Sequence, residues 1–355
     1  MVMLYSQNNS LVTMAQAAVP LAGGQQPSPS MRQSAGGQLV PFQPVGLYKP
    51  LTIMIHEAWT GKYPQHGFFL FASPQAMLLT SAMKGMLNTS AAPRAINFLT
   101  AALQPRTLLQ ANAATQPGSP LICYLPAVME SFYSLTIEMG FNTFNQQLFD
   151  SIASLFQQAS QIPAFMPASQ YLVAADSIIK LAADMGQILF NTGTVLSHNE
   201  PLPLALPGDP TVQAGFYLIV PDSPDGLAMQ QQYHVNTAGR VVDAAGNPYA
   251  GDVPYVVISL DGTQQPDSYK KFTPLAATAA QISTFLGVPD GTQAVASDLV
   301  KGMQLASDLS YRQRADQVNA QIAQTADSAA KQTLEEQYKA LLANINDPVM
   351  MPSNS

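Results

Sequence analysis

Charged side chains are scarce in this sequence. Asp, Glu, Lys and Arg together make up 10% of the 355 residues, whereas about 25% is usual for soluble domains. The apolar share of 47% is ordinary. The polar exterior must therefore come largely from Gln, Asn, Ser and Thr, and such a surface lacks the charge repulsion that keeps proteins apart. This composition favours a protein that packs against other copies or other subunits over a monomer kept soluble by its net charge of −7.

Long apolar runs and a basic N-terminal segment are also missing. A membrane-spanning helix needs about 20 consecutive apolar residues, and the longest runs here are short, such as residues 67–72 and 215–220. No transmembrane segment is predicted. Scattered basic residues and a negative net charge argue against nucleic acid as a partner. A secretory signal starts with basic residues, and the first one here is Arg32. We therefore expect a cytoplasmic protein, or one that belongs to an assembled or non-classically released particle.

The sequence also has few reactive groups and lacks the common catalytic motifs. Cys123 is the only cysteine, so no disulfide can form within the chain. It lies in an apolar run and is predicted to be a small buried side chain. The sequence contains no HExxH, GxSxG, Walker or GxGxxG motif. We therefore predict no catalytic residue and no cofactor.

Residues 1–47 differ in composition from the rest of the chain. They are rich in Gln, Ser, Gly and Pro and carry a single charge, Arg32. Such a stretch cannot bury enough apolar surface to fold alone. We expect an arm that is flexible, or that docks on a partner as extended strands through its apolar islands, residues 11–14 and 39–42.

Residues 48–262 are predicted to form a β-sandwich-like core. The clearest strand is 131–139, where Tyr133, Leu135, Ile137 and Met139 alternate with polar residues. Other expected strands are 51–56, 67–72, 76–83, 95–103, 120–125, 202–206, 214–220 and 254–260, with a hairpin at 233–242. Leu51–Ala58 and Asp252–Leu260 resemble strands of the C2 family. That resemblance implies a sandwich and carries over no functional residue.

Two parts of the chain have helical periodicity. In residues 144–190 apolar side chains recur about every 3.6 positions, and this pattern is interrupted near Pro163. The pattern predicts a helical hairpin inserted into the core. Residues 263–346 are predicted to be a helical C-terminal region, followed by a tail, 347–355. From Tyr311 onward, apolar positions step by four and three, the spacing of a helix-packing seam. The fold class is therefore mainly β or α+β.

Some residues are candidates for a site, each with an ordinary structural alternative. His56 and Glu57 follow the first strand of the core, and His66 lies in the loop beyond, so the three could bind a metal. Asp222 and Asp225 flank a turn and could bind calcium, although Asp is also a common turn residue. Trp59 and Tyr63 could stack on a ligand or sugar, although a tryptophan beside a strand is more often part of the core.

These observations favour a non-enzymatic structural or interaction protein that assembles with itself or with other protein subunits. Two alternatives stay open. One is an effector that binds membranes or glycans and forms pores, for which peripheral membrane contact would suffice. The other is a hydrolase whose residues meet only in the folded chain, for example around His56, His66 or His234.

Overall fold

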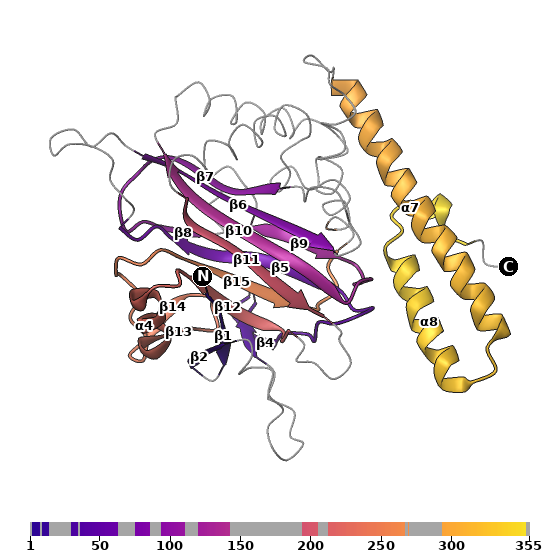
Figure 1. Cartoon of the computed structure of the whole chain (residues 1–355), viewed down its shortest axis with the longest axis horizontal. Helices are drawn as coiled ribbons and strands as arrows, with labels where there is room; N and C mark the ends of the chain where they lie inside the picture. The colour runs from indigo at the N-terminus through magenta and orange to yellow at the C-terminus, as the bar shows by residue number, and fades with distance from the viewer. Residues whose placement is uncertain are drawn as a thin grey trace.

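The structure is a computed structural model. It describes residues 2–7, 9–13, 30–34, 36–62, 75–85, 94–110, 120–142, 194–204, 212–266, 269 and 293–352. The expected helical hairpin 144–190 and the expected strand 67–72 lie outside these residues. The described chain is mainly β, with several antiparallel sheets and helices at its C-terminal end (Figure 1), which confirms the predicted fold class.

The larger sheet has seven antiparallel strands. Its strand order is β2 (Ser10–Thr13), β1 (Val2–Gln7), β12 (Gly215–Val220), β15 (Tyr255–Asp261), β5 (Leu51–Trp59) and β8 (Leu108–Gln110), and β9 (Leu121–Leu125) also pairs with β5. Strands β12 and β15 are buried along their whole length. Their nearly continuous apolar sequences fit strands that are covered on both faces.

The smaller sheet has four strands and packs on the first. Its strand order is β11 (Thr194–Pro203), β10 (Phe132–Asn142), β6 (Gln75–Gly85) and β7 (Arg94–Leu103). Ile53 and Ile55 of β5 share one apolar core with Leu135 and Ile137 of β10. The apolar side chains of the alternating pattern predicted for residues 131–139 therefore pack this sheet against the larger one. Two sheets joined through such a core form a β-sandwich.

A third layer covers the opposite, outer face of the larger sheet. It contains α4 (Pro224–Gln232), the hairpin β13 (Tyr233–Val235) to β14 (Val241–Asp243), and the hairpin β3 (Met31–Gln33) to β4 (Leu39–Pro41). A second apolar core lies beneath it, where Met229 and Val241 pack with Phe216 and Val257. The β13–β14 turn was predicted from its sequence, and Gly239 adopts φ +74° there.

The N-terminal residues belong to the sandwich. Strand β1 lies between β2 and β12, and Leu4 is fully buried. The sequence suggested a flexible arm, or one that docks on a partner. The structure places residues 2–7 and 10–13 in the larger sheet as strands β1 and β2. The apolar island at residues 11–14 does contribute a strand, β2, whose Leu11 is buried.

The C-terminal region is helical. Helices α7 (Gln293–Gln324) and α8 (Ser328–Ala343) form a hairpin to one side of the sandwich, followed by the short 3₁₀ helix η2 (Pro348–Met350) (Figure 1). Their contact buries Ala315, Val318 and Leu341. The Asn344 side chain donates to the Ala127 carbonyl at 3.0 Å and so attaches the hairpin to the sandwich. Among the described residues, no helix combines the length and apolarity needed to cross a bilayer.

Candidate functional site

A β-bulge in β5 directs two titratable side chains to the same face. Val257 of β15 opposes Glu57, but the next residue, Ile258, opposes Ile55, so His56 is an extra residue in the ladder. Ile55 and Ala58 both belong to the core between the sheets. The two residues between them, His56 and Glu57, therefore both face the outer layer. Bulges commonly re-aim side chains in this way and are frequent beside functional sites.

His56 is enclosed by three elements. Its Nε2 lies 2.8 Å from Ser259 Oγ on β15, and its ring meets the Phe216 ring edge-on at 4.9 Å. The β13–β14 turn lies directly over it, because a Cβ added to Gly239 would be 3.0 Å from His56 Cβ. Burial, and then the nearby Arg32 guanidinium, lower the pKa of His56 to about 4. The imidazole is therefore neutral at pH 7.

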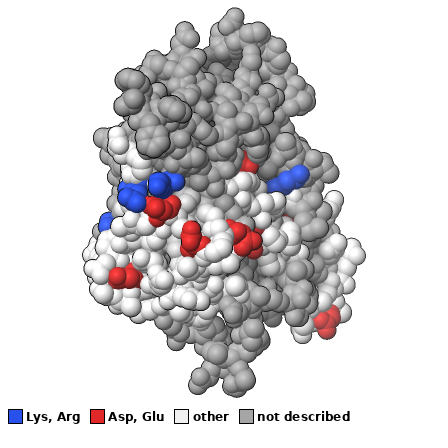
Figure 2. Space-filling model, turned by 60° about the vertical axis from the view of Figure 1, so that its left-hand side comes forward, with Lys and Arg blue, Asp and Glu red and all other residues white. Residues whose placement is uncertain are grey.

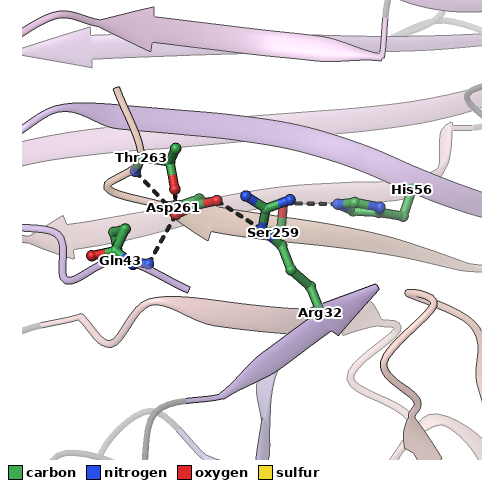
Figure 3. Close-up of polar contacts among 6 residues, drawn as sticks. All are labelled: Arg32, Gln43, His56, Ser259, Asp261 and Thr263. Atoms are coloured by element: carbon green, nitrogen blue, oxygen red, sulfur yellow. Dashed lines mark hydrogen bonds and ion pairs between the residues drawn. The ribbon is translucent and has the colours of Figure 1, made fainter. Parts of the chain in front are cut away.

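Asp261 is the anionic centre of the same face (Figure 3). One carboxylate oxygen lies 3.0 Å from Arg32 Nε, and the other accepts hydrogen bonds from the Gln43 backbone at 3.0 Å and from Thr263 Oγ1 at 2.8 Å. Arg32 also lies over the Phe42 ring, 5.7 Å from its centroid. These contacts hold the β3–β4 hairpin against the end of β15.

Glu57 has a separate set of partners. Its Oε1 accepts from the Val241 backbone N–H and from the Tyr255 hydroxyl, both at 2.9 Å. Burial raises the pKa of Glu57, and these two hydrogen bonds partly oppose that effect. The pKa of Tyr255 is also raised, by burial and by the adjacent Glu57. Glu57 therefore fixes the β13–β14 hairpin to the sheet, as Asp261 fixes β3–β4.

The chemistry open to this cluster is limited by these contacts. A neutral imidazole beside a hydroxyl can act as a base toward it, as His56 could toward Ser259. In nucleophilic sites a third group orients the base. The nearby carboxylate, Asp261, is instead held by Arg32 and by backbone donors, and Ser259 is buried. In the part of the chain that is described, this arrangement satisfies buried polar groups and joins the outer layer to the sheet.

The structure gives the other predicted ligand residues different positions. Trp59 is buried; it stacks on Tyr255, meets Tyr249 edge-on, and donates from Nε1 to the Gly251 carbonyl at 2.9 Å. Its ring is thus part of the outer core and is not presented to a ligand. Tyr63 and His66 lie outside the described residues. Within the described ranges, no three His, Cys, Asp or Glu side chains gather in a way that could hold a metal ion.

Asp222 and Asp225 lie at the start of α4, and both are exposed. The turn between them is explained by helix capping: Ser223 Oγ accepts from the Gly226 backbone at 3.2 Å. Asp225 lies in the first helical turn, where a negative charge interacts favourably with the helix dipole and stabilises the helix. These contacts account for the sequence pattern that suggested calcium.

His198, His234 and Cys123 make contacts of their own. His198 is on β11, where its Nε2 is 3.0 Å from Glu200 Oε2, and His234 is on β13 opposite Val242. Cys123 is buried with its Sγ 3.0 Å from Met83 Sδ, and burial raises the pKa of the thiol to about 12. The thiol is therefore protonated and unreactive at pH 7.

Sequence reasoning missed Arg32, Ser259 and Asp261 as members of one cluster. The only local signal is that Arg32 is the single charge in residues 1–47. A lone cation in a neutral segment needs a specific anion, but the sequence cannot identify it, since Asp261 lies more than 200 positions away.

Comparison with known proteins adds nothing to this geometry. No protein-family model, no curated protein and no solved structure matches the chain. The function must therefore be inferred from the chain's own residues and their contacts.

Proposed function

We propose that this protein is a non-enzymatic structural or interaction protein that assembles with copies of itself. The observation that carries the proposal is a group of exposed apolar side chains in the C-terminal region. Leu305, Leu309, Val349 and Met351 are exposed by 45%, 46%, 84% and 39%. We call these four residues the C-terminal apolar patch. Several large exposed apolar side chains in one region commonly mark a protein interface.

The patch is built on a rigid support. Leu305 and Leu309 are one helical turn apart on α7. The η2 segment that carries Val349 is fixed to the same helix, because Arg312 Nη1 donates to the Met350 carbonyl at 3.1 Å. Burying apolar surface contributes about 25 cal/mol per Å². A partner that covers the patch would gain this energy without having to order the segment first.

Sparse charge supports the same proposal. Among the residues that Figure 2 colours, most are uncharged, and the acidic and basic side chains lie in a few small groups. Two identical surfaces with few charges repel each other less than two highly charged ones do. In addition, the charged residues Arg32, Glu57 and Asp261 on this face of the sheet already form internal contacts, as Asp261 does with Arg32. The exterior is therefore better suited to assembly through uncharged surface than to recognition of a charged partner.

Light scattering on the whole protein tests the proposal. We expect a mass above that of one chain, rising between two concentrations, for example about 10 and 100 μM. The double variant Leu305→Gln/Leu309→Gln should shift the protein toward the monomer. Leu227→Gln on α4 is the matched control, because Leu227 is equally exposed, at 42%, but lies outside the patch. A monomer at both concentrations would contradict the proposal.

A further inference from the structure

We propose that strands β1 and β2 can be exchanged between copies, so that residues 2–13 of one chain complete the larger sheet of another. This inference rests on the proposed self-assembly and assigns a second copy of this chain as the partner at the β12 edge. Strand β1 pairs with β12 over four residues, Val2 to Tyr5 opposite Val220 to Tyr217. Its removal would leave the N–H and C=O groups of β12 unpaired along a buried strand, a strong template for an incoming strand.

The position that β1 occupies is shaped for this strand in particular. Gly215 has φ +151°, and a Cβ there would lie 2.6 Å from Tyr5 Cε2, so the absence of a side chain makes room for the Tyr5 ring. The Tyr5 hydroxyl contacts Ser30 Oγ at 2.7 Å and donates to the Ala214 carbonyl at 3.1 Å. The pairing of β1 with β12 is thus specified by side-chain shape as well as by backbone hydrogen bonds.

A second fixed point lies at Ser6. Its Oγ donates to the Val235 carbonyl at 3.0 Å and accepts from the Val235 backbone N–H at 3.2 Å. Leu4, on the same strand face, is fully buried in the outer core. An unrelated extended peptide would not reproduce this combination of Leu4, Tyr5 and Ser6. The strand that fits this position is therefore residues 2–13, and those of another copy would fit it as well as the chain's own.

The chain length allows the exchange. Sixteen residues connect Thr13 to Ser30, and an extended segment of this length spans about 50 Å. An exchanged strand would make the same contacts as the strand within its own chain, so exchange costs little beyond association itself. Because an exterior with few charges opposes close approach less than a highly charged one, the two copies can come near enough for these contacts to form.

Paired cysteines report which chain supplies β1. Val2 and Val220 are opposed in the register, and Cys123 is the only native cysteine. We would prepare Val2→Cys/Val220→Cys in a Cys123→Ala background and treat the folded full-length protein with an oxidant. In parallel, a short bismaleimide reagent would link thiols that do not reach disulfide geometry. The linked products are separated under denaturing, non-reducing conditions, and each single-cysteine variant is the control.

Exchange predicts that most linked protein migrates at twice the chain mass or as a ladder, and that neither single-cysteine variant does so. Linked protein that migrates as a single chain with both reagents would overturn the exchange. Light scattering on the same sample separates the two proposals. A single-chain product in a sample that is oligomeric removes strand exchange and leaves self-assembly, whereas a single-chain product in a monomeric sample removes both.

Discussion

The ion pairs Arg32–Asp261 and Arg106–Asp252 use the same chemical groups but differ in their exposure to water. In the first pair the side chains are 28% and 8% exposed, whereas in the second both are 54% exposed. Water screens an exposed pair, which typically contributes less than about 1 kcal/mol. Breaking a largely buried pair leaves a charge without compensation and costs more. Comparing the two pairs therefore shows how much burial adds to the stabilising effect of an ion pair in this protein.

We expect Asp261→Asn to lower the free energy of unfolding by about 2 kcal/mol, because Arg32 loses its anion and the Gln43 and Thr263 donors lose a charged acceptor. Asp252→Asn, the exposed control, should cost less than about 1 kcal/mol. Both values come from urea denaturation of the purified variants at pH 7. Equal losses in the two variants would mean that the buried cluster does not fasten the β3–β4 hairpin.

His56 should make stability depend on pH. Its pKa is about 4 in the folded protein and 6.5 for an ordinary histidine. Between these values the unfolded chain binds more protons than the folded one, so the contribution of His56 to stability falls as pH drops from 6.5 to 4 and changes no further below that. The shift corresponds to a loss of at most about 3 kcal/mol. His56→Gln should remove this slope.

The measurement is the difference in unfolding free energy between the two proteins at several pH values from 7 to 4. The difference cancels the contribution of other groups, including Glu57, whose raised pKa acts in the opposite direction. We expect the native protein to lose stability relative to His56→Gln as pH falls. Parallel curves would show that protons reach His56 as readily in the folded protein as in the unfolded one.

At the level of single residues, the sequence singled out His56 and Glu57 but not their arrangement. A regular strand would place the two side chains on opposite faces of the sheet. The bulge places both on the outer face, and a bulge is set by pairing with a distant strand, here β15. For Trp59 the sequence was sufficient: its place beside a strand favoured a core position, and the structure buries it.

Among the elements, the segment after α8 is tied to α7 by one buried carboxylate. Asp308 on α7 is fully buried, and its two oxygens accept from the Asn346 backbone at 3.1 Å and from the Asp347 backbone at 2.7 Å. A carboxylate can serve both donors, whereas an asparagine side chain has one acceptor oxygen. The contact decides how firmly the segment after α8 is held against α7.

We therefore expect Asp308→Asn to speed hydrogen exchange at the amide of Asn346 or Asp347 by about tenfold or more, since about 1.4 kcal/mol corresponds to a factor of ten. Exchange in the sandwich strands should stay as in the native protein. Glu335→Gln on α8 is the control, because Glu335 is an exposed acidic residue of the same hairpin. Unchanged protection at both amides in Asp308→Asn would exclude this role.

Element prediction succeeded where local pattern and tertiary contacts agree. β10 alternates because one face meets the core, and β12 and β15 are apolar because both faces are covered. β11 was expected at 202–206 but spans Thr194–Pro203. Among the described strands it lies at the end of the sheet path, beside β10, where its polar residues can pair without an apolar sequence pattern. β1 was missed because its pairing with β12 is non-local and its surroundings have the composition of a polar arm.

At the scale of the whole molecule, scarce charge and buried ion pairs lead to one expectation for assembly. Arg32, Glu57 and Asp261 already have internal partners. The four side chains of the C-terminal apolar patch are uncharged and are bordered by the Arg312–Asp316 pair. Association through the patch would therefore be driven by removing apolar surface from water. Such association depends little on simple salt, but it weakens on cooling and strengthens with sulfate.

We expect the dissociation constant of the assembled protein to change less than threefold between 0.05 and 0.5 M NaCl, whereas contacts between exposed charges would be strongly screened over this range. Ammonium sulfate at about 0.5 M should strengthen association, and cooling from 25 to 4 °C should weaken it. Sedimentation velocity over a concentration series measures all three. Leu305→Gln/Leu309→Gln should lose the responses to sulfate and to cooling, because the apolar surface that causes them is gone, while Leu227→Gln should keep them. Association that falls tenfold or more in NaCl would instead point to charged contacts and would place the interface away from the C-terminal apolar patch.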